Sequence, residues 1–178
     1  CDNEQRVIMD VAVVKIIFSL LFSFLITLYF VPFFSLIAYR FNILDIPDGK
    51  VKKHTQATPY LGGIAVYSGF LCGLIFTIPV YSTKILLLIL GSTLLLILGL
   101  IDDLVQLKPY QKFFGQSIVA FCFLKAGFYL KEHFFYNVWN LPLSFLWILI
   151  VINAFNLVDV MDGLATSLAF YAAIIFLV

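Results

Sequence analysis

The chain has 178 residues, of which 63% are hydrophobic and 12% charged, and its mean hydropathy is +1.07. A soluble domain is nearer half apolar and a quarter charged, so this composition excludes an ordinary soluble domain and predicts a multi-pass membrane protein. The net charge of +1 says nothing about nucleic acid, and no basic run interleaved with aromatics suggests it, so we expect no nucleic-acid partner. The three cysteines form no CxxC pair and indicate neither a disulfide framework nor a zinc site.

Long runs with almost no charge recur along the chain, and about 20 apolar residues suffice to cross a bilayer. We predict an all-α, polytopic transmembrane helical bundle with five complete spans and the beginning of a sixth. The expected spans cover residues 16–39, 59–83, 85–101, 113–130, 141–158 and 164–178. The chain starts without Met and ends inside an apolar run, so we expect one membrane-embedded domain over residues 1–178, incomplete at both ends.

If each run crosses the membrane once, the loops after the first, third and fifth spans share one side. They hold most of the polar side chains, namely Asp45, Asp48, Lys50, Lys52, Lys53, His54, Asp102, Asp103, Lys108, Lys112, Asp159 and Asp162. Dense basic clusters favour the cytoplasm. The cluster at 50–53 therefore predicts a cytoplasmic face here and an N-terminus on the other side.

The first of these loops combines turn residues with basic side chains. A turn sequence at 47–49 precedes Lys53 and His54, and residues 59–63 open the next helix, whose N-terminal amides could meet an anion. The basic cluster could bind phosphate. A solvated anchor beside lipid headgroups explains the same residues equally well.

The second loop places Asp102 and Asp103 side by side at a helix end. Adjacent carboxylates repel each other unless a cation lies near, and at a helix C-terminus they also face the negative end of the helix dipole. This penalty predicts a functional site; the alternative is that both acids merely end a helix in water. Lys112 and Gln116 lie one turn apart at the next span, either as interfacial residues or directed at the same pocket.

The third stretch, 153–165, spaces two amides and two carboxylates three residues apart at the end of an apolar run: Asn153, Asn156, Asp159 and Asp162. A carboxylate at membrane depth is opposed by roughly 2.5–3.5 kcal/mol, so such groups usually mark a pathway, a metal or a substrate. On a helix, the four would spread over about half the circumference and form an oxygen-rich face suited to Mg²⁺.

Three motifs now carry a resemblance. They are Asp45-Ile-Pro-Asp-Gly49 with Lys53-His54 and Pro59-Tyr-Leu-Gly-Gly63; Gly99-Leu-Ile-Asp-Asp103; and Asn153-Ala-Phe-Asn-Leu-Val-Asp-Val-Met-Asp-Gly-Leu-Ala165. In order, spacing and placement after alternate spans, they resemble the polyprenyl-phosphate N-acetylhexosamine-1-phosphate transferases of glycosyltransferase family 4. The chain resembles the N-terminal half of a member.

The resemblance implies that an N-acetylhexosamine-1-phosphate, expected to be GlcNAc-1-phosphate, passes from a UDP-sugar to a polyprenyl phosphate with release of UMP. The acceptor would be undecaprenyl phosphate in a bacterium, and the step would open a cell-envelope glycan pathway such as cell-wall or lipopolysaccharide synthesis. It further implies Mg²⁺ as cofactor, with Mn²⁺ as the alternative ion, and a multi-pass protein of the inner or plasma membrane. A homodimer is left open.

The resemblance also implies roles for individual residues. Asn156 and Asp159 would hold Mg²⁺ and the donor diphosphate, while Asn153 and Asp162 would belong to the nucleotide-sugar pocket. The other roles are acceptor positioning by Asp102 and Asp103, with Asp102 as a candidate base, a phosphate contact by Lys112, and lipid-phosphate binding by Lys53 and His54.

One departure and three alternatives remain open. Val160 stands where the family commonly has Gly or Asn, and the family's later Asp and its His-rich loop would lie beyond Val178, so residues 1–178 alone are expected to be inactive. The stretch 58–63 favours the UDP-GlcNAc type over a phospho-MurNAc-pentapeptide transferase. An ion-coupled transporter would want acids near the bilayer midplane, whereas these lie at span ends. A CDP-alcohol phosphatidyltransferase would need an Arg that the Asp162 motif lacks.

Overall fold

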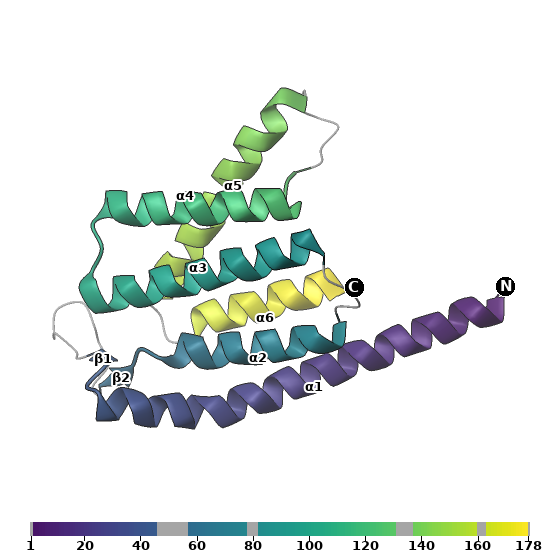
Figure 1. Ribbon diagram of the computed structural model, residues 1–178, viewed down its shortest axis with the longest axis horizontal. Helices are drawn as coiled ribbons and strands as arrows, with labels where there is room; N and C mark the ends of the chain where they lie inside the picture. Colours follow the sequence, from purple (N-terminus) through teal and green to yellow (C-terminus); the bar gives the residue numbers. More distant parts are fainter. Residues whose placement is uncertain (1, 46–56, 78–81, 131–136, 160–162, 178) are drawn as a thin grey trace. The chain divides into compact units, whose positions relative to one another are not determined.

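The computed structural model describes residues 2–45, 57–77, 82–130, 137–159 and 163–177. Along them the elements are α1 (Asp2–Arg40), β1 (Leu44–Asp45), β2 (Thr58–Pro59), α2 (Gly62–Thr77), α3 (Thr83–Val105), α4 (Pro109–Ala126), α5 (Asn137–Val158) and α6 (Leu164–Leu177), as Figure 1 shows. The predicted all-α class is confirmed, since the two strands have only two residues each.

Three helical segments are long and apolar enough to cross a membrane, namely Asp10–Arg40, Thr83–Val105 and Val138–Val158, and two shorter apolar helices are Gly62–Thr77 and Leu164–Ile175. These helices agree with a membrane-embedded protein. The number of crossings stays a prediction. Helix α4 begins at Pro109, four residues before the expected start at 113, because Pro109 is suited to the first helical position.

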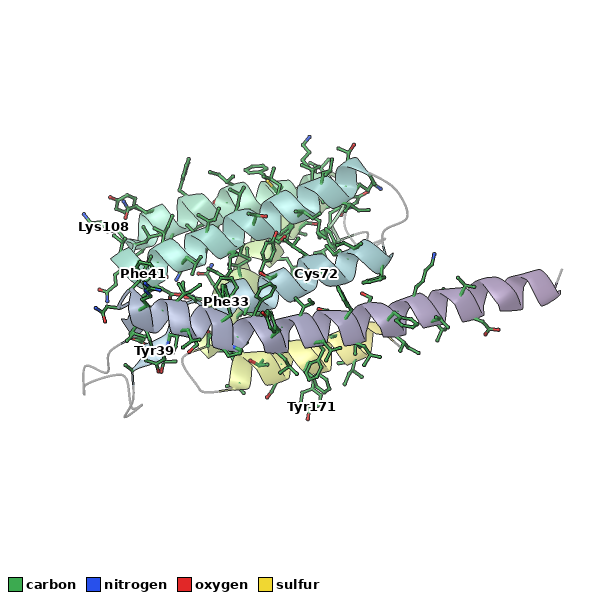
Figure 2. All side chains as sticks on the ribbon, turned by 60° about the horizontal axis from the view of Figure 1, so that its bottom comes forward. Phe33, Tyr39, Phe41, Cys72, Lys108 and Tyr171 are labelled. Atoms are coloured by element: carbon green, nitrogen blue, oxygen red, sulfur yellow. The ribbon has the colours of Figure 1, made fainter. Side chains whose placement is uncertain are left out.

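Large apolar side chains face outward along these helices. On α1, for example, Phe18 and Leu25 are each 61% exposed. Figure 2 shows Phe33 on the same helix and Tyr39 near its C-terminal end, and both side chains are exposed as well. In water such a surface would be costly, whereas in a bilayer it lies against lipid tails.

The chain divides into two compact units, and each is described by itself. Unit 1 comprises Cys1–Ser82 and Leu96–Leu107, and unit 2 comprises Thr83–Leu95 and Lys108–Val178. Helix α3 therefore contributes its first half to unit 2 and its second half to unit 1.

In unit 1, α1 and α2 run side by side and meet through small residues (Figure 1). Gly69 and Gly73 are buried on α2, and the Ser19 hydroxyl of α1 donates a hydrogen bond of 2.7 Å to the Gly73 carbonyl oxygen. A Cβ atom at Gly69 would lie 2.0 Å from Thr27 Oγ1 and 2.7 Å from the Ser23 carbonyl oxygen. Glycine is required here because the two backbones approach too closely for a side chain.

The two short strands join the end of α1 to the start of α2. They pair antiparallel, with Leu44 opposite Pro59 and Asp45 opposite Thr58. The Tyr60 hydroxyl donates to Asp45 Oδ1 at 2.9 Å. This pairing fixes both ends of the first motif at one place on unit 1.

In unit 2, α4 has well-defined ends. Its first turn is closed by the Lys108 backbone N–H, which donates to Gln111 Oε1 at 3.0 Å, and it stops at Gly127, whose φ of 102° is left-handed. Gly91 on α3 allows a close approach to α4, since a Cβ atom there would lie 2.9 Å from the Phe123 ring. At Gly99, by contrast, no atom of the described residues lies within 4 Å of a Cβ atom built there.

Substitution of Gly69 tests the contact between α1 and α2. We expect Gly69→Ala to lower the free energy of unfolding by about 1–3 kcal/mol, because the new methyl group would overlap the Ser23 carbonyl oxygen and Thr27. Thermal unfolding in detergent would measure it. Gly99→Ala is the matched control: it adds a methyl group to open space in a helix and should be neutral or stabilising by up to about 1 kcal/mol. Equal midpoints for the two variants would contradict the close packing.

Candidate functional site

Two pairs of polar side chains link α4 to α5 in unit 2. Lys112 Nζ donates to Asn156 Oδ1 at 2.7 Å. Gln116 lies one turn further along α4, and its Oε1 accepts a hydrogen bond of 2.9 Å from Asn153 Nδ2 on α5. In return, Gln116 Nε2 donates a longer bond of 3.4 Å to Asn153 Oδ1. Because α4 supplies residues four apart and α5 residues three apart, each helix presents one face to the other.

The environment of these pairs explains why they form. Gln116 is only 2% exposed, and Lys112 is half-buried. Burying an amide without a hydrogen-bond partner costs several kcal/mol in an apolar medium, so a buried glutamine must find a partner across the interface. Asn153 and Asn156 are themselves exposed and can meet a ligand.

Asp159 lies directly after α5, one turn beyond Asn156. Its backbone N–H still donates to the Phe155 carbonyl oxygen at 3.0 Å, and its side chain is exposed. A carboxylate at this end of a helix is disfavoured by the helix dipole, and a bound cation would remove the penalty. Asn153, Asn156 and Asp159 thus follow one another at the C-terminal end of α5, and the oxygen-rich face that also includes Asp162 stays a prediction.

The oxygen atoms of this face fit Mg²⁺ only in part. Mg²⁺ in proteins is commonly held by one or two carboxylates together with waters and substrate phosphates. Within the described part of the chain, no group of three or more His, Cys, Asp and Glu residues could hold a metal ion. Asp159 and Asn156 would thus need the phosphates of a substrate to complete the coordination of the ion, and the metal site stays a prediction.

Asp102 has a structural partner that the sequence did not reveal. Helix α3 ends because Gln106 adopts a left-handed φ of 55°, and the Gln106 N–H donates to the Asp102 carbonyl oxygen at 2.8 Å. The next N–H, of Leu107, donates to Asp102 Oδ1 at 3.2 Å. Asp102 is half-buried in this turn, whereas Asp103 is exposed. Part of the expected cost of the acidic pair is therefore offset by a helix cap.

The predicted site residues fall into three groups. Lys112, Asn153, Asn156 and Asp159 come together on unit 2, while Asp102 and Asp103 belong to unit 1. Lys53, His54 and Asp162 lie outside the described residues, as does Val160.

Further contacts were also missed by sequence reasoning. Gln116 was noted for its spacing from Lys112, but its partner Asn153 lies 37 residues away and no local pattern indicated the pair. The bond from Tyr60 to Asp45 was likewise unforeseen, since no signal in the sequence links the two residues.

The chain is similar in sequence to one protein family and to several named transferases. Residues 85–178 match the family model described as Glycosyl transferase family 4. The chain is 30% identical over 169 residues to a Bacillus subtilis protein named "Probable undecaprenyl-phosphate N-acetylglucosaminyl 1-phosphate transferase", covering 90% of this chain and 47% of the relative. No solved structure is a significant match.

Two further relatives differ in the group that their names say they transfer. An undecaprenyl-phosphate alpha-N-acetylglucosaminyl 1-phosphate transferase of Thermotoga maritima is 32% identical over 143 residues, covering 79% of this chain and 44% of the relative. A phospho-N-acetylmuramoyl-pentapeptide-transferase of Prochlorococcus marinus is 33% identical over 142 residues, covering 68% of this chain and 39% of the relative. The chain spans less than half the length of these relatives.

Two substitutions separate the hydrogen bond that the Asp102 side chain accepts from the negative charge that it carries. We expect Asp102→Ala to make opening of the turn about fivefold more frequent, because it removes a hydrogen bond worth about 1 kcal/mol. Asp102→Asn keeps the accepting oxygen and should leave the turn closed. Hydrogen exchange of the Leu107 amide, followed by mass spectrometry, measures this, with Asp103→Ala as the control. The cap would be refuted if Asp102→Ala and Asp103→Ala exchanged this amide at the same rate.

Proposed function

The chain belongs to glycosyl transferase family 4, and on that premise we propose that the whole protein transfers N-acetylglucosamine-1-phosphate from UDP-N-acetylglucosamine to a polyprenyl phosphate, with release of UMP. The main structural support for this proposal is the hydrogen bond between Lys112 and Asn156, which lies one turn before Asp159. An ammonium group, an amide and a carboxylate at the end of an apolar helix suit a phosphate ester at a membrane surface.

The chemistry asks little of the protein beyond position and charge. An oxygen of the acceptor phosphate forms a bond to the phosphorus atom that carries the sugar, and the bond from that phosphorus to the bridging oxygen breaks. The bridging oxygen leaves as part of UMP. A phosphate monoester has a second pKa near 6 and is therefore largely dianionic at neutral pH. Positioning and electrostatic stabilisation consequently matter more than a strong general base.

Residues of unit 2 would handle the donor. Asn156 and Asp159 would hold the ion and the diphosphate, and the Lys112 ammonium, already on the Asn156 oxygen, lies within reach of the same phosphates. Mg²⁺, when bound, would neutralise the charge that develops on the departing UMP. Asn153 would face the nucleotide sugar, together with Asp162.

Residues of the first two motifs would handle the acceptor. Lys53 and His54 would bind the lipid phosphate. Asp102 and Asp103 would position that phosphate, and Asp102 also accepts the Leu107 N–H and closes the helix. This face would be the cytoplasmic side of the inner or plasma membrane, where UDP-sugars are available and where the basic cluster is favoured.

The donor is tested with the protein at its full natural length, reconstituted in vesicles that contain undecaprenyl phosphate and Mg²⁺. We expect UMP release with UDP-N-acetylglucosamine and none with UDP-N-acetylmuramoyl-pentapeptide. The reverse preference would assign the protein to the other transferase type, to which the Prochlorococcus relative belongs by name. No UMP from any UDP-sugar, together with cation flux across the vesicles, would instead favour a transporter.

The role of Asp159 is tested in the same vesicles. Asp159→Asn should lower UMP release by at least about a hundredfold, because it removes the carboxylate that would hold the ion, and the ion would stabilise the charge that develops on the phosphates during transfer. Asp10→Asn is the matched control, since Asp10 is an exposed carboxylate on α1 and should leave transfer unchanged. Unaltered transfer by Asp159→Asn at saturating Mg²⁺ would remove Asp159 from the site.

A further inference from the structure

The amide pair between Gln116 and Asn153 fixes the direction of the Asn153 side chain. Asn153 Nδ2 has two hydrogens, and both are used: one goes to Gln116 Oε1 at 2.9 Å and the other to the Leu149 carbonyl oxygen, also at 2.9 Å. An asparagine amide has no further hydrogen to donate. Asn153 can therefore approach a ligand only through its oxygen.

The Leu149 carbonyl oxygen selects this orientation, because it can only accept, and Gln116 holds the oriented Asn153 side chain through the amide pair. If the Asn153 amide were turned over, its oxygen would face both the Leu149 carbonyl oxygen and Gln116 Oε1, and Gln116 would have to turn as well. The Leu149 carbonyl oxygen cannot donate, so the turned arrangement would bring two acceptors together. Gln116 is 2% exposed and is held between the helices, whereas Asn153 is exposed on the side from which a ligand can arrive.

We propose that Gln116 is a positioning residue, which acts through Asn153 and holds the Asn153 oxygen toward a hydrogen-bond donor of the nucleotide sugar, a hydroxyl or an N–H group. This inference rests on the proposed function, because it takes the UDP-sugar as the ligand. The oxygen keeps lone-pair capacity, since the only bond that it accepts from Gln116 is long, at 3.4 Å. Gln116 itself does not touch the substrate.

The experiment is a double-mutant cycle in the full-length protein, with Gln116→Met, Asn153→Ala and the double variant. Methionine has a similar volume but offers Asn153 no strong acceptor. We expect Gln116→Met to raise the KM for UDP-N-acetylglucosamine about tenfold and to change kcat by less than about threefold, because ground-state binding is lost. In the Asn153→Ala background the same substitution should have no further effect on KM.

Controls separate positioning from folding. Ser117→Ala removes a neighbouring hydroxyl that bonds only to its own helix, at the Phe113 carbonyl oxygen, and should change neither KM nor the unfolding midpoint. If Gln116→Met does not fold, Gln116→Asn takes its place in the cycle, since it keeps an amide but is one methylene too short to reach Asn153. The proposal would be overturned if Gln116→Met left the KM for UDP-N-acetylglucosamine unchanged. It would also be overturned if Gln116→Met raised this KM by the same factor in the wild-type and the Asn153→Ala backgrounds.

Direct titration with UDP-N-acetylglucosamine separates this inference from the proposed function. A wild-type protein that binds the nucleotide sugar but releases no UMP would reject the transferase activity, and the ratio of dissociation constants in the cycle would still decide on Gln116. The expected ratio is again about tenfold for Gln116→Met and about one in the Asn153→Ala background. A wild-type protein that does not bind the nucleotide sugar would overturn both proposals.

Discussion

The need to pair polar side chains between apolar helices is the constraint on which the candidate site depends. In lipid there is no hydrophobic force that drives one apolar helix against another, so association relies on close packing and on hydrogen bonds between helices. Helices α4 and α5 meet this need with an ammonium–amide pair and an amide–amide pair. Three of these four side chains, Lys112, Asn153 and Asn156, are thus also the ones that would meet the substrate. Stability and binding cannot be altered independently at these three positions.

In the described part of unit 1, helices associate without hydrogen bonds between side-chain amides. Helices α1 and α2 approach through Gly69, Gly73 and the small hydroxyl side chains of α1, with the Ser19 hydroxyl bonded to a backbone oxygen. Backbone proximity replaces side-chain pairing, and the rest of α1 is left to face lipid. Two polar side-chain contacts of unit 1 lie in its loops, where Tyr60 bonds to Asp45 and Asp102 caps α3.

The sequence predicted what depends on local pattern and missed what depends on the register between helices. Charge-free runs located the long helices, and the three-residue spacing placed Asn153 and Asn156 on one face of α5. The partners of these asparagines lie 37 and 44 residues away, and the rotation of α4 about its axis decides which side chains meet them. Gly91 and Gly99 are equivalent by pattern, yet only Gly91 has a neighbour within 4 Å. The sequence predicted an electrostatic penalty for Asp102 at the end of α3, and its hydrogen bond with the Leu107 N–H offsets part of that penalty. This contact was not predicted because the left-handed turn at Gln106 has no clear sequence signal.

The fixed direction of the Asn153 amide also sets a rule for the chemistry of inhibitors. With its hydrogens committed to Gln116 and Leu149, the residue offers an incoming compound lone pairs and nothing else. An analogue that places an ether or carbonyl oxygen there would bring acceptor against acceptor, whereas an amine or alcohol of the same shape would be accepted. Two compounds that a purely steric description treats as equivalent would therefore be separated by the polarity of one atom.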